Sequence, residues 1–452
     1  MCCKEKNAKE HTVTDAINVN IERMAYSADA VGHLPSGKTV FVEGAAPGDV
    51  VSVEIVEEKS SFVRARLVEV VEASLDRVPP ASLSDAMTGS APWQHIAYSA
   101  QLRAKRDNVV SQLVRTAHIP AEEAERIVAQ TLPSKREWGY RNKIEMGAKT
   151  RPDGKIDLGF YREGSHDLVT VDETLLAHKS IQKAPKALRG AIRYAQGSQD
   201  QGIYRVGVRH SLVTGDLEIA LWTAPGPFPR SRFAQILGNS LKATSVVRVM
   251  ADPGKARKIK GVETLDGRGY WRDRIGDAQF STQAPSFFQV NTAQAAKLVD
   301  KVMEGLGGVD GKFVADLYAG GGTFSIPLAM AGADVVAVES ARSSVRDLRF
   351  NADANGVYVD VVGGDAAREL REIGQLDALV VDPPRAGLAD SVPGDIAAAA
   401  PEAVAYVSCN PSTWARDVAR FMEQGYDLQL ATPVDLFPQT YHVEVVSIFK
   451  RR

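Results

Sequence analysis

Four residues that can bind or react each follow an apolar run in the C-terminal third of the chain. They are Glu339 after DVVAV, Asp365 after VYVDVVGG, Asp382 after LDALVV and Cys409 after AVAYVS. Carboxylates accept hydrogen bonds from a nucleoside, and a cysteine thiolate is a nucleophile. Most cysteines only pack, but a loop position directly before Asn410-Pro411 favours a reactive side chain. The pattern therefore indicates nucleoside binding and a nucleophilic step at one site.

These positions require a doubly wound α/β sheet, in which ligands lie beyond the carboxyl ends of parallel strands. Residues 313–329, FVADLYAGGGTFSIPLA, predict its first strand, a glycine turn and a helix start. The loop lacks the third glycine of the dinucleotide fingerprint, and alone it fits a structural turn equally well. Glu339, about twenty residues later, is placed to accept both ribose hydroxyls. Strands over 428–437 and 442–450 would complete seven strands, and S-adenosylmethionine is the simplest cofactor for this arrangement.

Composition sets further bounds. With 452 residues, 44% of them hydrophobic, the chain predicts two or three domains. A net charge of −2 argues against a histone-like binder, so a nucleic-acid surface must be a local patch. No apolar run is long enough for a membrane helix, and the charged first residues lack the apolar core of a signal peptide. Cys2, Cys3 and Cys409 cannot form a disulfide framework, so we expect a cytoplasmic protein.

Three domains are expected. Residues 12–75 alternate β-rich runs with turn signals and predict a small closed barrel of the OB type. Residues 76–275 predict a central α+β domain, in which the helical segment 97–130 packs on the catalytic domain. Residues 276–452 form the doubly wound domain. A barrel of this kind either binds RNA or only covers the next domain.

Basic residues alternate with aromatic ones in the central domain. The segments are EWGYRNKIEMGAKTRPDGK (137–155), KARKIKG (255–261) and GRGYWRDR (267–274). Aromatic rings stack on unpaired bases and cations contact phosphates. Ordinary solvated hairpins have similar composition, and composition alone favours that interpretation over RNA binding.

Several longer motifs resemble the RNA uracil-5-methyltransferases. They are QHIAYSAQLRAKR (94–106), YRNKIEM (140–146), SFFQVN (286–291), DLYAGGGTFS (316–325), DPPRAG (382–387), YVSCNPSTWARD (406–417) and DLFPQTYHVEVV (435–446). They cover most of the chain, and their order is far more specific than any single motif. The resemblance implies a class I (Rossmann-like) methyltransferase domain, an N-terminal TRAM barrel and an RNA-binding central domain.

The resemblance also implies roles. Cys409 is the expected nucleophile towards carbon 6 of uracil, and Glu444 the base that removes the carbon 5 proton. His442 is a rival base that we interpret as a positioning residue. Arg385 fits either a phosphate contact or an internal ion pair. The residues implicated in binding S-adenosylmethionine are Gln289, Tyr318, Thr323, Glu339, Asp365 and Asp382, of which Asp382 fits the uracil edge equally well.

Many family members hold an iron–sulfur cluster with four cysteines, which this chain lacks. Thr88, Ala91 and Thr174 stand at three of those positions. Because thiolates ligate such clusters, we expect no cluster and no metal. The expected protein is a monomer that acts on RNA, with ribosomal RNA favoured over transfer RNA because of the barrel. The alternatives are a cytosine-5 RNA methyltransferase, disfavoured by the missing second cysteine, and a non-catalytic RNA-binding or folding protein.

Overall fold

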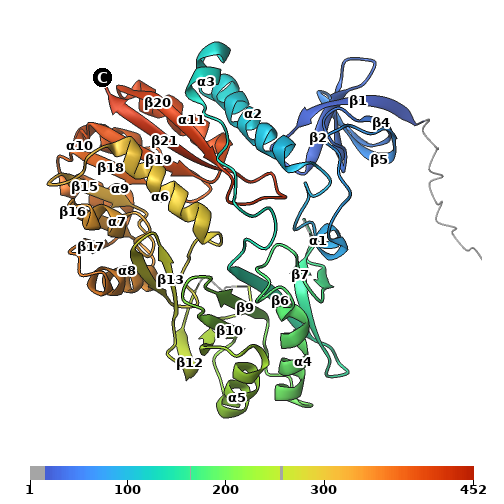
Figure 1. Ribbon diagram of the computed structural model, residues 1–452, viewed down its shortest axis with the longest axis vertical. Helices are drawn as coiled ribbons and strands as arrows, with labels where there is room; N and C mark the ends of the chain where they lie inside the picture. Colours follow the sequence, from blue (N-terminus) through green and yellow to red (C-terminus); the bar gives the residue numbers. More distant parts are fainter. Residues whose placement is uncertain (1–15, 163, 255–257) are drawn as a thin grey trace, which may run out of the picture.

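The computed structural model describes residues 16–162, 164–254 and 258–452, so Cys2 and Cys3 lie outside the described residues. In this part of the chain the strands form a closed five-stranded barrel, two seven-stranded sheets and a two-stranded hairpin. The barrel, the central sheet and the C-terminal sheet lie around a shared middle (Figure 1). The predicted α/β class with an N-terminal barrel is confirmed. None of the helices in these ranges is long and apolar enough to cross a membrane.

The barrel is built from short strands whose β-branched residues alternate between core and solvent. Its strands are β1 (Ile17–Met24), β2 (Asp29–His33), β3 (Thr39–Glu43), β4 (Val50–Glu58) and β5 (Phe62–Glu72), in the order β1-β2-β3-β5-β4. Val19, Ile21 and Val40 are among its buried residues. Gly32 faces an irregular register in β1, where an added Cβ would lie 2.3 Å from the Asn20 carbonyl oxygen. The barrel therefore needs glycine at that position.

The central sheet has the order β12-β11-β10-β9-β6-β7-β8. Its strands are β6 (Lys143–Thr150), β7 (Ile156–Tyr161), β8 (Leu168–Thr170), β9 (Arg205–His210), β10 (Leu217–Thr223), β11 (Ser245–Met250) and β12 (Gly261–Gly267). Helices α4 (Ala184–Gln196) and α5 (Arg230–Leu241) pack with the strands in one apolar cluster. β12 is an edge strand, so one side of it faces away from the sheet.

The C-terminal sheet has the order β17-β16-β15-β18-β19-β21-β20. Its strands are β15 (Phe313–Leu317), β16 (Asp334–Glu339), β17 (Asp360–Gly363), β18 (Ala378–Val381), β19 (Ala403–Ser408), β20 (Tyr426–Val434) and β21 (Glu444–Arg451). β15 to β19 pair in parallel, whereas β21 runs antiparallel between β19 and β20. The predicted seven-stranded sheet is present.

Helices cover both faces of this sheet and create two apolar cores. One core holds α6 (Thr292–Leu306), α7 (Ser325–Met330) and α8 (Arg342–Ala354). The other holds α9 (Ala366–Ile373), α10 (Val392–Ala399) and α11 (Pro411–Glu423). Strands buried on both faces read as continuous apolar runs, which explains the uniformly buried β18 and β19.

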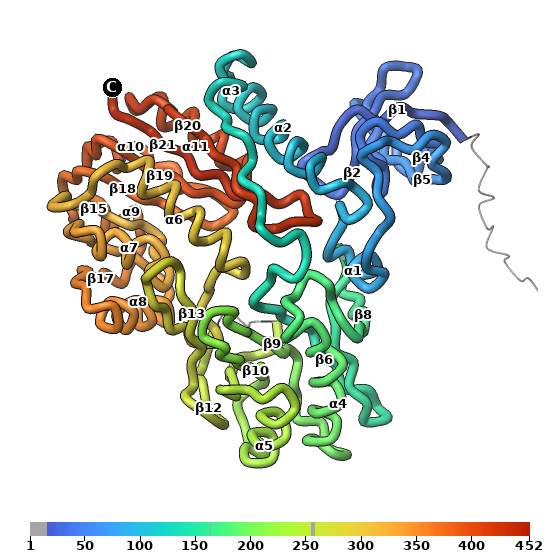
Figure 2. The backbone as a smooth tube through the Cα atoms, in the orientation of Figure 1, coloured from blue at the N-terminus to red at the C-terminus, as the bar shows by residue number. Residues whose placement is uncertain are grey.

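The helix predicted over 97–116 is present as α2 (Tyr98–Thr116), followed by α3 (Ala121–Ile127). Val109 and Leu113 of α2 join the same apolar core as α11, which accounts for the amphipathic pattern. Residues after α3 then pair with the outer strand of the sheet, Val128 with Ala431 and Leu132 with Val434. Figure 2 shows this segment descending beside the C-terminal sheet towards the central sheet. It covers the β20 edge, which would otherwise expose unpaired backbone groups.

Two short elements join these parts. Helix α1 (Leu83–Thr88) follows the barrel, and a hairpin of β13 (Trp271–Ile275) and β14 (Ala278–Thr282) precedes the C-terminal sheet. The predicted domain boundary at 275/276 falls in the turn of this hairpin. The domain boundaries predicted from the sequence, at 75/76 and 275/276, remain predictions.

Candidate active site

The glycine loop after β15 opens towards the strand ends. Tyr318, Gly320 and Gly322 all have positive φ, of 64°, 57° and 95°. A Cβ added at Gly322 would lie 2.4 Å from Leu348 Cδ1, so this glycine serves packing. At Gly320 an added Cβ would meet no atom of the described residues within 4 Å. The loop therefore leaves space for a ligand beside its backbone.

Glu339 joins the end of β16 to this loop. Its two carboxylate oxygens accept hydrogen bonds from the Gly320 and Ala341 amides, at 2.9 and 2.6 Å. Each oxygen has a second lone pair, so the carboxylate can still receive ribose hydroxyls. The placement fits the role predicted for Glu339.

The other predicted cofactor residues occupy different surroundings. Asp365 is exposed and caps α9 by accepting a hydrogen bond from the Arg368 amide at 3.2 Å. Burial, and next the charge of Asp365, raise the pKa of Tyr318, which places these two side chains near each other. Thr323 is half-buried before α7. Gln289 is buried before α6, where its carbonyl oxygen accepts a bond from Asn142 Nδ2 at 2.9 Å.

Antiparallel β21 explains why Glu444 lies beside Cys409. Its first residue is Glu444, and the next, Val445, pairs with Ser408 at the end of β19. The start of β21 therefore lies at the edge where β18 and β19 end, which brings Glu444 to the loops that carry Asp382 and Cys409.

The proximity of Cys409, Glu444 and Asp382 is reflected in their pKa values. The pKa of Cys409 is raised to about 11, first by burial and then by Glu444 and Asp382, whereas Arg385 lowers it. Burial also raises the pKa of Glu444 well above its usual range, with Asp382 adding to the shift and Arg385 opposing it. Asp382 has a pKa of about 7, raised by burial and then by Asp316. Both Cys409 and Glu444 thus favour their neutral forms.

Side-chain hydrogen bonds to the backbone join the Cys409 loop to the loop after β18. Asn410 Nδ2 and Thr413 Oγ1 each donate to the Arg385 carbonyl oxygen at 3.1 Å. Asn410 also caps α11 through the Ser412 amide. These bonds link the loop that carries Cys409 to the backbone of Arg385.

The barrel also reaches this loop, which the sequence did not predict. Tyr26, between β1 and β2, donates its hydroxyl to the Cys409 carbonyl oxygen at 3.1 Å. Trp93 Nε1 fixes the neighbouring backbone by donating to the Ser27 carbonyl at 3.0 Å. Tyr26 also meets Tyr441 edge-to-face, with ring centroids 5.7 Å apart. No local motif marks Tyr26, because its partners are almost the whole chain length away.

The loop 435–443, which leads to Glu444, is fastened to α2. Lys105 Nζ donates to Asp435 Oδ1 at 2.5 Å and to the Phe437 carbonyl, and both charged side chains are fully buried. The side-chain amide of Gln101 exchanges two hydrogen bonds of 2.9 Å with Gln439. Arg106, in the same basic run, pairs with Glu125 instead. The motif at 94–106 therefore positions the 435–443 loop.

His442 lies in this loop and is a poor base. Burial, followed by the nearby Arg385, Lys105 and Arg141, lowers its pKa to about 3. Its ring packs on Tyr441, with centroids 4.3 Å apart. This surrounding supports our interpretation of His442 as a positioning residue.

Asp316 is a second residue that the sequence analysis missed. It is fully buried on β15, bonded by the Ser325 hydroxyl, and its pKa is raised to about 7, chiefly by burial. Within the described chain its Oδ1 has no hydrogen-bond partner. The acid directly before the glycine loop, in DLYAGGG, was the available signal.

The positions expected to replace cluster cysteines carry hydrogen bonds. Thr174 donates to Asp85 at 2.6 Å, and Asp85 also accepts from Ser82 and from the Leu175 amide. Thr88 donates to the Ser84 carbonyl, and Ala91 is buried. Across the described ranges no group of three His, Cys, Asp or Glu residues is arranged to hold a metal ion.

Comparisons with known proteins show which family this chain resembles. A family model described as tRNA (Uracil-5-)-methyltransferase matches residues 272–452, and the TRAM domain model matches 11–68. A curated RNA methyltransferase of Lactobacillus johnsonii is 33% identical over 448 residues, covering 96% of this chain and 98% of the relative. One of Thermosynechococcus vestitus is 32% identical and covers 96% and 97%.

Among solved structures, the Pyrococcus abyssi tRNA (uracil-54, C5)-methyltransferase in complex with S-adenosyl-L-homocysteine is similar to this chain. The TM-score is 0.74 at 27% identity, covering 95% of this chain and 99% of the other. The resemblance found in the sequence motifs is thereby confirmed. The chain belongs to the S-adenosylmethionine-dependent RNA uracil-5-methyltransferases.

Proposed function

We propose that the enzyme methylates carbon 5 of a uridine in folded RNA through a covalent adduct between Cys409 and carbon 6. The observation that carries this proposal is the meeting of Cys409, Glu444 and Asp382 at the ends of β19, β21 and β18. Carbon 5 of uracil is a weak nucleophile, and addition of a thiolate to carbon 6 makes it enolate-like. A reactive cysteine and a buried base are the groups this chemistry needs.

The steps use these side chains in order. The Cys409 thiolate forms a bond to carbon 6, and carbon 5 takes the methyl group. Glu444 in its carboxylate form removes the carbon 5 proton, and the Cys409–carbon 6 bond breaks to restore the double bond. Because the thiol pKa is about 11, its proton must leave before attack, and Arg385 is the cation that favours ionisation. A neighbouring carboxylate is the natural acceptor of this proton.

S-adenosylmethionine supplies an electrophilic methyl group when bound. The open space at Gly320 and the free lone pairs of Glu339 fit its adenosine part. The residues proposed to hold it are Gln289, Tyr318, Thr323, Glu339, Asp365 and Asp382. A uridine in a duplex or folded loop must first be flipped out of its stack, which costs a few kcal/mol.

Ribosomal RNA and transfer RNA are both candidate substrates. The preference for ribosomal RNA rested on the barrel. The similar tRNA enzyme covers 95% of this chain, a span that must include most of the barrel, so the barrel does not discriminate between them.

The test uses methyl-labelled S-adenosylmethionine and size-separated total RNA from cells lacking the gene. Label in 5-methyluridine that disappears with Cys409→Ala supports the mechanism, and the labelled fraction names the substrate. Label in 5-methylcytidine would show that the target base is cytosine instead of uracil. No label with folded wild-type enzyme would favour a binding protein instead.

A further inference from the structure

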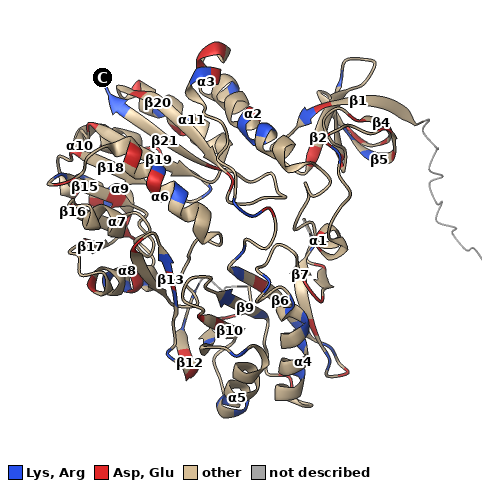
Figure 3. Ribbon diagram, in the orientation of Figure 1, with Lys and Arg blue, Asp and Glu red and all other residues tan. Residues whose placement is uncertain are grey.

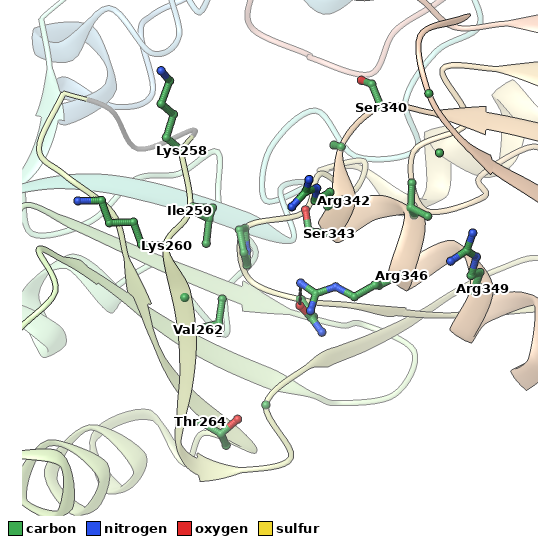
Figure 4. A pocket seen from close by; sticks show the side chains of 18 of the residues that line it. Lys258, Ile259, Lys260, Val262, Thr264, Ser340, Arg342, Ser343, Arg346 and Arg349 are labelled. Atoms are coloured by element: carbon green, nitrogen blue, oxygen red, sulfur yellow. Dashed lines mark hydrogen bonds between the residues drawn. The ribbon is translucent and has the colours of Figure 1, made fainter. Parts of the chain in front are cut away.

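A large cleft separates the central sheet from the C-terminal domain. It measures about 1320 Å³ and lies between the start of β12, the strap 283–285 and the N-terminal half of α8 (Figure 4). Its far end is lined by Ser340 and Asp365, which follow β16 and β17. The cleft therefore opens at the same sheet edge as the candidate active site.

Helix α8 presents two faces with different tasks. Asp347, Asn351 and Asn355 accept hydrogen bonds from the amides of Gln283, Ser281 and Gln279, at 3.1, 2.7 and 2.8 Å. This i, i+4, i+8 series fastens the helix to the outer edge of β14. Exposed Arg342, Arg346 and Arg349 lie at i, i+4 and i+7 on another face and line the cleft. Because the first face is fixed to the β14 segment, the second face places its three arginines along the cleft.

The opposite wall is the open edge of the central sheet. Lys258 and Lys260 precede β12 and line the wall opposite Arg342 and Arg346, although the Lys260 side chain extends away from these arginines (Figure 4). Lys260 forms an exposed ion pair with Asp252, 2.7 Å apart. Ile259 between them is also exposed. Two chain segments about eighty residues apart thus contribute cations to one space.

Several contacts hold the walls at a fixed separation. Tyr270 packs on Phe350 of α8 with ring centroids 5.7 Å apart. Arg209 of β9 donates to the carbonyl oxygens of Gln283 and Ala284 in the strap and of Ser286, which follows it. The cleft is therefore a built feature of the junction.

Elsewhere Lys and Arg are mixed with Asp and Glu over the molecule (Figure 3). Among the described residues that line this cleft, five are cations and Asp365 is the one carboxylate. We propose that the cleft between β12 and α8 binds the phosphate backbone of the substrate RNA and leads it to the strand ends. This rests on the proposed function. The phosphate backbone makes RNA a polyanion. Arginines and lysines spaced along a cleft neutralise its phosphates and release the bound counterions.

The test measures RNA affinity at several salt concentrations with Arg342→Ala/Arg346→Ala. The probes are end-labelled ribosomal and transfer RNA fractions from cells lacking the gene. Each lost phosphate contact lowers the slope of log K against log salt by about 0.7 to 0.9. We expect the slope to fall by about 1.4 to 1.8 and the Kd near 0.1 M salt to rise about ten-fold. The kcat at saturating RNA and the S-adenosylmethionine affinity should stay at wild-type values.

The matched control is Arg126→Ala/Arg452→Ala, which removes two exposed arginines outside the cleft and should leave the RNA affinity unchanged. An unchanged slope and Kd in the cleft variant would overturn the proposal. So would weaker S-adenosylmethionine binding with intact RNA affinity, which would assign the cleft to the cofactor. Failure of the proposed function is a different result, namely wild-type enzyme that binds RNA but forms no 5-methyluridine.

Discussion

The hydroxyl of Tyr26 donates a hydrogen bond to the carbonyl oxygen of Cys409, 3.1 Å away and 383 residues later in the chain. Burial raises the pKa of Tyr26, and Cys409 and Glu444 raise it further, so the phenol stays a neutral donor at ordinary pH. The barrel thus contacts the loop that carries Cys409 as well as covering the neighbouring domain. A movement of the barrel on RNA binding would therefore change the position of that loop.

Replacing Tyr26 by Phe should therefore slow turnover without weakening RNA binding. One partly buried hydrogen bond is worth about 1 kcal/mol, which corresponds to a decrease in kcat of roughly three- to ten-fold. Steady-state methylation with labelled cofactor measures kcat and KM separately, and Tyr194→Phe, at an exposed tyrosine of α4, is the control. Wild-type kcat in Tyr26→Phe would mean that the loop keeps its position without this contact.

The sequence predicted the residues that stand at the ends of parallel strands, because strand direction alone gathers them. Glu339, Asp365, Asp382 and Cys409 are of this kind. Glu444 required the family resemblance, since its place depends on β21 running antiparallel to β19. Tyr26 was out of reach because it contacts the site only through packing of the barrel against the catalytic domain.

The same limit applied to α2. The sequence predicts a docked helix here, but nothing in its basic run, Arg103 to Arg106, marks one of the cations as buried. The structure instead buries Lys105 against Asp435, a pairing that depends on where the 435–443 loop passes the helix. Periodicity located the helix, but it could not identify a buried cation.

Replacing Lys105 by Met should destabilise the fold strongly. The change leaves the Asp435 carboxylate buried without its cation, which typically costs about 3–5 kcal/mol. Denaturant unfolding measures the loss. Lys105→Met/Asp435→Asn removes the unpaired charge while keeping an acceptor for the Tyr98 hydroxyl, and should recover part of it. No recovery in the double variant would show that the cost comes from packing.

Arg385 should set the pH dependence of the reaction. Its positive charge lowers the pKa of both Cys409 and Glu444. Arg385→Gln raises both pKa values, so the rise of kcat/KM with pH should move to higher pH. A shift of one pH unit corresponds to a ten-fold loss at neutral pH. Arg385→Lys keeps the charge and is the control. If Arg385 mainly contacts RNA, the loss will be independent of pH.

Replacing Glu444 by Gln should stop turnover after the adduct forms. Without a base the carbon 5 proton stays, and the Cys409–RNA bond cannot break. A denaturing gel should show a covalent protein–RNA band with Glu444→Gln, and no such band with Cys409→Ala/Glu444→Gln. Free RNA in both lanes would argue against Glu444 as the base.

The same variant should also be more stable than the wild type at high pH. Because the folded pKa of Glu444 lies well above its unfolded value near 4.5, the folded state binds a proton that the unfolded chain releases. Wild-type stability must therefore fall as pH rises through that window, by up to about 1.4 kcal/mol per pH unit from this group. Glutamine has no proton to lose. Thermal unfolding should give Glu444→Gln a higher Tm at pH 8 and a difference close to zero at pH 4. Equal Tm values at both pH values would mean that Glu444 ionises normally in the folded enzyme.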